Sequence, residues 1–289
     1  MKQPQWITVG AGVILTLAIF VFGRTVPHKK VIATEAHSAE DGHNHAGPST
    51  VAFSIDSILT IAKKQLKPEQ VTRLALLESS ISRGNVKDQQ LHIYHQLSQF
   101  WGDSAGLFQP YAWYKAEAAR LENSEKTLTF AARLFLDEVQ IEPNPALRQW
   151  EALQAKDLFE RSLIINPAND SAKVGIGACY LFGNISEAPM EGIGKIMEVV
   201  AKDSTNVYAQ LTLAKGALVS GQLDKAVTRL QLVNRLKPDN IEAIVMLADV
   251  YERTDRKALA ADWYQKSLQY IKRPDARADI EKRIAELRK

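Results

Sequence analysis

The chain of 289 residues has one cysteine, Cys179, and therefore cannot form an intramolecular disulfide. It also lacks a charge imbalance, because 36 lysines and arginines stand against 33 acidic residues, for a formal net charge of +3. The two signs are interleaved rather than clustered, a pattern typical of a solvated surface. We therefore expect neither a disulfide-stabilised scaffold nor a nucleic-acid-binding protein.

The common catalytic motifs are missing as well. The sequence has no phosphate-binding loop, no GxSxG nucleophile elbow, no HExxH zinc motif and no Rossmann glycine fingerprint. Gly175 and Gly177 fall inside a helical pattern without a preceding strand, so we interpret them as packing residues. Acidic residues are scattered at the spacing of solvent-exposed helix faces. We expect no catalytic residues and no cofactor.

What the chain does contain is an internal repeat between residues 207 and 274. When 241–274 is laid over 207–240, an offset of 34 residues, equivalent positions coincide: Leu213 with Leu247, Ala214 with Ala248, Ala226 with Ala260, and Leu230 with Tyr264. Each unit contains two apolar-periodic helices separated by a turn, at Ser220-Gly221 and at Thr254-Asp255. Such a hairpin cannot bury its own apolar faces, so the units must stack.

These residues resemble the tetratricopeptide repeat (TPR) family. Ala248 matches its small residue of the first helix, Ala260 and Tyr264 match the alanine and aromatic of the second, and Pro238 matches the closing proline of the preceding unit. The chain departs from the family pattern at Gln210, Ala217 and Lys272, where an aromatic, a tyrosine and a proline are usual. The resemblance implies an all-α solenoid of stacked helix-turn-helix repeats that binds other proteins.

In such solenoids the first helices of successive units line a binding surface. Counting along each unit gives the groove candidates Phe182, Tyr208, Leu211, Lys215, Leu218, Glu242, Val245, Asp249 and Arg253. An apolar groove with a mixed rim suits an amphipathic helix or an extended apolar segment of another protein. A homo-oligomer, or packing of these groups against the N-terminal helices, is the alternative.

Some family members bind C-terminal carboxylates through a clamp of lysine, asparagine and arginine. The corresponding positions here are Gly175, Cys179, Leu211 and Asp249, which are apolar or acidic. We therefore expect no carboxylate clamp.

The N-terminal stretch between Gln3 and Gly23 has no charged residue. Residues 6–22 would span about 25 Å as a helix, at the short end of what crosses a bilayer. No small-x-small cleavage site follows, which favours a retained single-pass anchor over a cleaved signal peptide. We expect an anchor in a bacterial inner membrane, with the side of the folded part left open because positive charge flanks both ends.

Residues 25–50 show no helical or strand period and read as a flexible tether. Four of the six histidines fall here, beside three acidic residues. His37, His43 and His45 are the candidate ligands for zinc, copper or nickel. A metal-binding or metal-responsive envelope protein acting through this linker is therefore the alternative function. A third possibility is an accessory subunit whose catalytic partner is another chain.

The remaining chain reads as helices. We predict Ser54 as an N-cap, Pro68 at the start of the next helix, a helical hairpin over 68–101, a loop over 102–109, and core packing for the aromatics around Trp113. A polar helix at 275–289, capped by Asp275, presents Ile280, Ile284 and Leu287 on one face and would end the array. The predicted divisions are the anchor 1–24, the linker 25–50, degenerate repeats 51–168, TPR repeats 169–274 and the capping helix 275–289.

Overall fold

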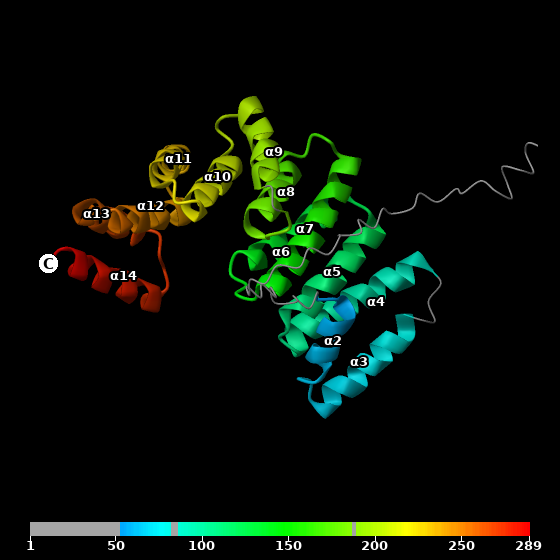
Figure 1. The fold of residues 1–289 in the computed structure, drawn as a ribbon. Coiled ribbons are helices and arrows are strands. Elements are labelled where there is room, and N and C mark those ends of the chain that lie inside the picture. Colours follow the sequence, from blue (N-terminus) through cyan, green and yellow to red (C-terminus); the bar gives the residue numbers. More distant parts are fainter. Residues whose placement is uncertain (1–52, 82–85, 187–188) are drawn as a thin grey trace, which may run out of the picture. The chain divides into compact units, whose positions relative to one another are not determined.

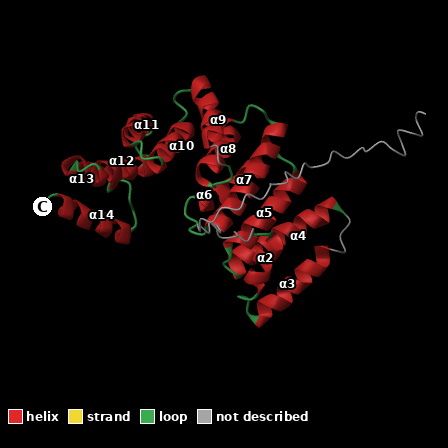
Figure 2. Cartoon of the chain, viewed as in Figure 1, coloured by secondary structure: helices red, strands yellow, loops and turns green. Residues whose placement is uncertain are grey.

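The computed structural model describes residues 53–81, 86–186 and 189–289, all within the compact unit Thr50–Lys289. In these residues every regular element is a helix (Figure 2), so the all-α prediction is confirmed. None of the helices in these ranges is both long and apolar enough to cross a bilayer. The predicted anchor at 6–22 and the linker at 25–50 lie outside the described residues.

Successive helices pair into hairpins (Figure 1). The hairpins are α4 (Lys87–Gln99) with α5 (Phe108–Glu122), α6 (Glu125–Val139) with α7 (Pro145–Ile165), α8 (Asp170–Phe182) with α9 (Pro189–Lys202), α10 (Val207–Val219) with α11 (Leu223–Leu236), and α12 (Ile241–Arg253) with α13 (Lys257–Ser267). Each hairpin packs on the next, through α5 on α6, α7 on α8, α8 on α10 and α11 on α12. The predicted stack of helical-hairpin repeats is confirmed.

The first described helices, α2 (Ile55–Lys63) and α3 (Pro68–Ile81), begin where the sequence predicted. Ser54 caps α2 by accepting a hydrogen bond from the Ser57 amide at 3.2 Å, and Pro68 is the first residue of α3. The predicted helical pair over 68–101 corresponds to α3 and α4, which contact each other, but α4 packs more extensively on α5 than on α3. The apolar period identifies a helix but does not specify which neighbour it packs against.

The predicted loop over 102–109 is also shorter than expected. A π-helical turn at Phe100–Ser104 continues from α4, and α5 already begins at Phe108. Phe100 and Trp101 are fully buried there, with their rings 5.3 Å apart in an edge-on arrangement. Burial of these two rings holds the turn against the core. The glycine and polar residues that follow them indicate a loop, so the sequence pattern does not predict this burial. The prediction that Trp113 packs in the core is confirmed, because its ring centroid lies 6.2 Å from that of Trp150 in the core cluster.

An asparagine begins the first helix of each of the last three hairpins. The side chains of Asn169, Asn206 and Asn240 accept hydrogen bonds from backbone amides three residues on, at 2.9, 3.0 and 2.8 Å. Asparagine is among the best N-cap residues because its side chain satisfies an amide that the helix leaves unpaired. Each cap stabilises its helix by about 1 kcal/mol. These caps therefore fix where each repeat starts.

Small residues let the paired helices approach each other. Ala214 and Ala226 of one hairpin, and Ala248 and Ala260 of the next, have no exposed surface. Larger side chains such as Leu230 fill the space beside them and join adjacent hairpins into one core. The alternation of small and large positions explains why the sequence repeats with its fixed period.

The last helix, α14 (Pro274–Leu287), packs against α13 as the predicted capping helix. Ile284 is buried, and Ile280 and Leu287 pack partly buried beside it, so the predicted apolar face is confirmed. The predicted N-cap Asp275 is wrong. Pro274 takes the first helical position, which suits its fixed φ, and Arg273 is the N-cap. Asp275 instead forms an ion pair with Arg273.

Candidate functional site

A groove of about 760 Å³ opens beside the carboxyl ends of α6, α8 and α10, which are the first helices of three successive hairpins. We call it the α8–α10 groove. Its lining residues are Val139, Gln140, Pro145, Arg148, Tyr180, Leu181, Phe182, Asn184, Ser186, Pro189, Lys215, Leu218, Val219 and Met246. This position is the one that the repeat pattern predicts for a binding surface, because first helices of neighbouring units face it.

Apolar side chains supply much of the groove surface. Phe182 at the end of α8 and Leu218 on α10 are half-buried, so each presents part of its side chain to solvent. Val219, the last residue of α10, is 74% exposed. Because these residues lie on neighbouring hairpins, they form an apolar strip that continues across the repeat boundary. Such a strip can bury the apolar side chains of a bound segment.

Lys215 connects three of the first helices across the groove. Its ammonium donates a hydrogen bond to Gln140 Oε1 at 2.7 Å and pairs with Glu242 Oε1 at 2.5 Å. Only 23% of the lysine side chain is exposed. The cation is thus already engaged by the end of α6 and the start of α12, and it acts as a tie between hairpins more than as a free donor.

Arg148 at the start of α7 forms part of the groove wall. Its Nη2 donates to the Pro143 carbonyl at 3.3 Å, while its Nε is buried without a hydrogen-bond partner among the described residues. Because this nitrogen has almost no exposed surface, it is closed to an acceptor from a segment bound in the groove. Sequence reasoning did not single out Arg148, because nothing in the local pattern distinguishes it from a solvated arginine.

The structure brings three of the predicted groove residues together, namely Phe182, Lys215 and Leu218. Leu211 is 8% exposed and packs into the C-terminal core, and Val245 packs partly buried against the same core. Residues within one turn of a helix can face either the core or the groove. Counting positions along the sequence does not show which of them faces the groove.

The other predicted groove residues are not among those that line the groove. Tyr208 packs under the Arg133 guanidinium at 4.9 Å, and burial raises its pKa to about 12. Glu242 is the partner of Lys215, Asp249 accepts a hydrogen bond from the Tyr264 hydroxyl at 2.5 Å, and Arg253 is exposed. Whether a partner contacts these residues stays a prediction.

Gly175 and Cys179, at two of the positions equivalent to a carboxylate clamp, pack inside the protein instead. Cys179 is fully buried, and burial raises the pKa of its thiol. Gly175 is buried against the ring of Phe159, with no room for a side chain. Neither position can therefore present a cation to the groove.

The histidines divide between the two parts of the chain. His37, His43 and His45 lie outside the described residues, so the metal-linker hypothesis stays a prediction. On α4, the Nε2 atom of His95 lies 3.3 Å from Glu122 Oε1 on α5. This contact joins the two helices of the hairpin and accounts for His95 as a packing residue.

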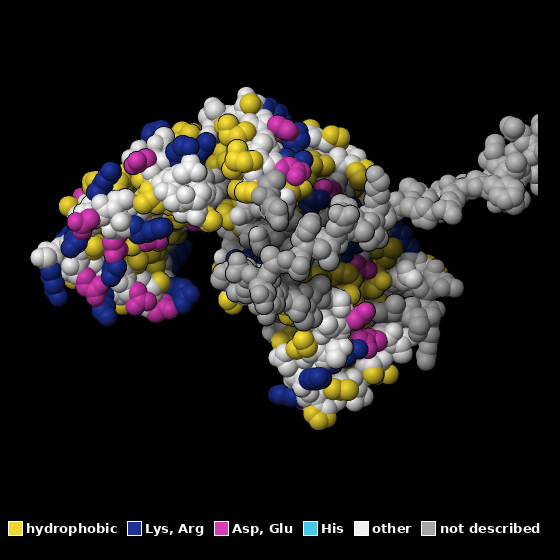
Figure 3. All heavy atoms as spheres, in the orientation of Figure 1, with side chains coloured by type: hydrophobic (Ala, Val, Ile, Leu, Met, Phe, Trp, Pro, Cys, Tyr) yellow, Lys and Arg dark blue, Asp and Glu magenta, His cyan; other side chains and the backbone are white. Residues whose placement is uncertain are grey.

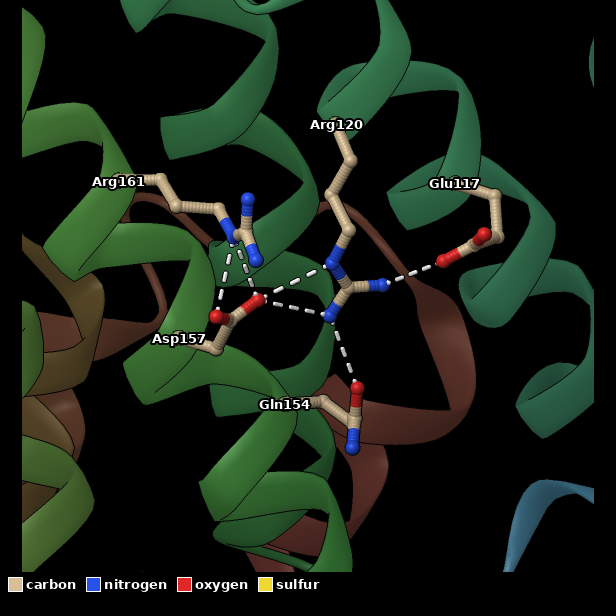
Figure 4. A network of polar contacts seen from close by, with 5 residues as sticks. All are labelled: Glu117, Arg120, Gln154, Asp157 and Arg161. Carbon is tan, nitrogen blue, oxygen red and sulfur yellow. Dashed lines mark hydrogen bonds and ion pairs between the residues drawn. The ribbon is translucent and has the colours of Figure 1, made fainter. Parts of the chain in front are cut away.

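A polar network joins the second helices of two neighbouring hairpins (Figure 4). The Arg120 guanidinium on α5 donates to Glu117, to Gln154 and to Asp157 on α7, at 2.8, 2.9 and 3.0 Å. Arg161 donates to both oxygens of Asp157 at 3.0 Å. Because these donors already have partners within the chain, we assign the network to stacking of α5 on α7 rather than to a ligand site.

Charge over the C-terminal helices is mixed. Figure 3 shows lysine and arginine side chains interspersed with acidic ones over α11 to α14. Arg283 pairs with Glu286 at 3.1 Å and with Glu252 of the preceding hairpin, and Arg277 pairs with Glu281 at 3.6 Å. The face in this view therefore lacks a single-sign patch that would steer a charged partner.

Comparison with known proteins supports the fold. No family model matches the chain, and no curated protein matches its sequence. Among solved structures, a tetratricopeptide repeat protein from Parabacteroides merdae aligns over 81% of this chain and 86% of its own, with a TM-score of 0.51 and 14% identity.

Two further structures align less closely. MamA from Desulfovibrio magneticus RS-1 aligns over 62% of this chain and 94% of its own, with a TM-score of 0.41 and 21% identity. YrrB, described as a TPR protein with an unusual peptide-binding site, aligns over 71% and 97%, with a TM-score of 0.39 and 14% identity. At these TM-scores the two carry no argument about this chain. The described residues are thus similar in fold to tetratricopeptide repeat proteins, as stacked helical hairpins.

Proposed function

We propose that this chain is a membrane-tethered, TPR-like scaffold that binds a segment of another protein in the α8–α10 groove and performs no catalysis itself. The observation that carries the proposal is the apolar strip of Phe182, Leu218 and Val219, which crosses from one hairpin to the next. Exposed apolar surface of this kind, placed on the first helices of a repeat array, is typical of a docking surface.

The groove chemistry indicates what the bound segment would present. Apolar side chains would cover the strip, and an amphipathic helix or an extended apolar segment can place them at suitable intervals. Lys215 is held by Gln140 and Glu242, so it would shape the groove floor without supplying the main charge contact.

The tether is the part of the proposal that depends on the sequence alone. The uncharged stretch at 6–22 would anchor the chain in a bacterial inner membrane, and residues 25–50 would separate the repeats from the bilayer. A topology reporter fused after Lys289 would report on which side the repeats lie. Release of the full-length chain by carbonate extraction would count against the anchor.

The groove is tested by crosslinking the intact protein in cells and identifying the bound chains by mass spectrometry. Val219→Glu adds a charge to the apolar strip at a position that is 74% exposed, so the fold should tolerate it. We expect the yield of the bound partner to fall by about tenfold or more, because interface centres lose most from such changes.

Leu259→Glu is the matched control, since Leu259 on α13 is 45% exposed and outside the groove lining. It should leave the partner yield unchanged. Equal yields from wild type and Val219→Glu would refute docking in this groove. If Val219→Glu instead converts a dimer to a monomer in light scattering, the strip serves self-association.

A further inference from the structure

The turn between α6 and α7 brings together three carboxylates from separate points in the sequence. Glu138 lies near the end of α6, Glu142 in the turn, and Glu151 two turns into α7. One carboxylate oxygen of each residue lies within 4.8 Å of an oxygen of the others. Like charges at this separation repel strongly in a partly buried setting, so the arrangement requires a bound cation or a proton.

The surrounding side chains do not supply that charge. Within the described ranges, no lysine, arginine or histidine nitrogen lies within 4.0 Å of these three carboxylates. Glu142 Oε1 accepts from the Asn144 amide at 2.6 Å, and Glu151 Oε1 accepts from Gln109 Nε2 at 3.3 Å. Arg148, on the same helix as Glu151, directs its Nη2 to the Pro143 carbonyl instead. Neutral donors thus satisfy part of the trio and leave its charge uncompensated.

Glu151 provides the second observation, independent of the clustering. Its side chain is fully buried, and its Oε2 has no hydrogen-bond partner among the described residues. Burial, together with the charges of Glu138 and Glu142, raises the pKa of Glu151 to about 8 against the opposing hydrogen bond from Gln109. A buried carboxylate oxygen without a partner is costly unless a proton or a metal ion meets it.

We propose that Glu138, Glu142 and Glu151 bind a hard divalent cation, with Ca²⁺ the best fit. All three ligands are carboxylate oxygens, which Ca²⁺ prefers, and Ca²⁺ binds oxygen at about 2.3–2.6 Å. Two oxygens on one Ca²⁺ can therefore lie up to about 5 Å apart, which accommodates the observed 4.8 Å limit. Mg²⁺ forms shorter bonds of about 2.0–2.1 Å and demands near-ideal octahedral geometry, whereas Ca²⁺ tolerates an irregular set of carboxylates.

The surroundings allow the coordination to be completed and give the ion a role. Glu138 and Glu142 are half-buried, so water can reach the ion from their side. Val139 and Gln140 follow Glu138 directly and line the α8–α10 groove, as does Pro145 just after the turn. A bound ion would therefore hold the end of α6, the turn and α7 in one arrangement, and so fix one wall of that groove.

The full-length protein, stripped of metal, tests the proposal through Tb³⁺ luminescence and thermal unfolding. Tb³⁺ substitutes for Ca²⁺ and emits when a nearby tryptophan is excited, and Trp150 is the neighbour of Glu151 in sequence. We expect saturable Tb³⁺ emission that Ca²⁺ displaces, together with a higher Tm in Ca²⁺. Glu151→Gln keeps the shape of the side chain and should weaken Tb³⁺ binding by about tenfold or more.

Glu198→Gln is the control, because Glu198 on α9 is exposed and the substitution removes the same charge. It should bind Tb³⁺ as the wild type does. Glu142→Gln provides a second test at a half-buried ligand, and circular dichroism establishes that each variant is folded. The proposal is overturned if Tb³⁺ emission is unchanged in both ligand variants. It is also overturned if Ca²⁺ leaves the Tm unchanged while acidification to pH 6 raises it, since the trio then holds a proton.

Discussion

At the scale of single residues, two glycines set how closely α8 and α9 pack. A Cβ built on Gly192 would lie 2.6 Å from the Gly177 carbonyl oxygen, and one on Gly177 would lie 2.6 Å from the Gly192 carbonyl oxygen. Both contacts are with backbone, which cannot rotate away as a side chain can. The hairpin therefore depends on the absence of a side chain at both positions.

Gly177→Ala should accordingly destabilise the protein by about 1–3 kcal/mol, the usual cost of overpacking a closely packed core. Gly194→Ala on the partner helix α9 is the control, because a Cβ there meets no atom within 4 Å. It should be neutral or stabilise by up to about 1 kcal/mol, since alanine favours helix more than glycine does. Urea unfolding of the two variants gives both free energies. Equal losses of unfolding free energy in the two variants would show that the close approach of α8 and α9 at Gly177 does not determine stability.

The packing role of residues that recur in the internal repeat was predictable from the sequence. Contacts between residues that are distant in the sequence were not. The packing role of Ala248, Ala260 and the equivalent residues of the preceding unit can be inferred because these alanines recur at a fixed offset. Glu138 and Glu151 are 13 positions apart, and only the turn between α6 and α7 brings them together. Glu151 in particular looks like a solvated acid by its spacing, yet it is buried.

At the scale of elements, the contact between α5 and α7 combines the apolar pair Trp113–Trp150 with a charged network centred on Arg120 and Asp157. Burial by itself raises the pKa of Asp157, but hydrogen bonds and charge from Arg161 and Arg120 outweigh it and hold that pKa below its usual value. A group with a lowered pKa in the folded state stabilises the fold above its unfolded pKa. That stabilisation is lost as the pH falls through the folded pKa.

Asp157→Asn should therefore reduce stability at neutral pH and lose its effect in acid. We expect a loss of about 0.5–1 kcal/mol at pH 7, kept small because the Asp157 side chain is 41% exposed and solvent screens it. The difference from wild type should shrink below about pH 4, near the unfolded pKa of an aspartate. Asp262→Asn, at a 73% exposed position on α13, is the control. A pH-independent difference would contradict the electrostatic role of Asp157.

Helices themselves were largely predictable, but their pairing was predictable only where the repeat is regular. The two clear units gave the hairpins α10–α11 and α12–α13, with turns at Gly221 and Asp255, both of which have positive φ. Before residue 168 the repeats are degenerate, and the assignment of 68–101 as one hairpin did not anticipate that α4 packs more extensively on α5 than on α3. The π-helical turn at Phe100–Ser104 shortens the connection to α5, and apolar periodicity carries no information about that choice of partner.

At the scale of the whole molecule, the described part is an array in which each hairpin contacts its neighbours in sequence. Its buried residues fall into several clusters, and the cluster of the last two hairpins with α14 contains Leu230, Leu247, Tyr264 and Ile284. A separate cluster surrounds Phe135 and Phe159 in α6 to α8. The sequence predicted this stacking, since hairpins with one apolar face must cover each other. It could not give the groove register, because whether Leu211 faces core or groove depends on the angle at which neighbouring helices cross.

The hairpins should therefore contribute separately to the stability of the array. A destabilising substitution in the last helix should affect only the helices that pack near it. Ile284→Glu places a charge in the buried face of α14, where the side chain is 5% exposed, and should loosen α12, α13 and α14 together. Hydrogen exchange followed by mass spectrometry should show faster exchange in those helices, with protection of α6 and α7 retained because their cluster contains none of the same residues. Ala285→Glu, on the exposed side of α14, should leave exchange unchanged. A uniform loss of protection from α4 to α14 would mean that the hairpins unfold as one unit, and the solenoid description of the stability would then be wrong.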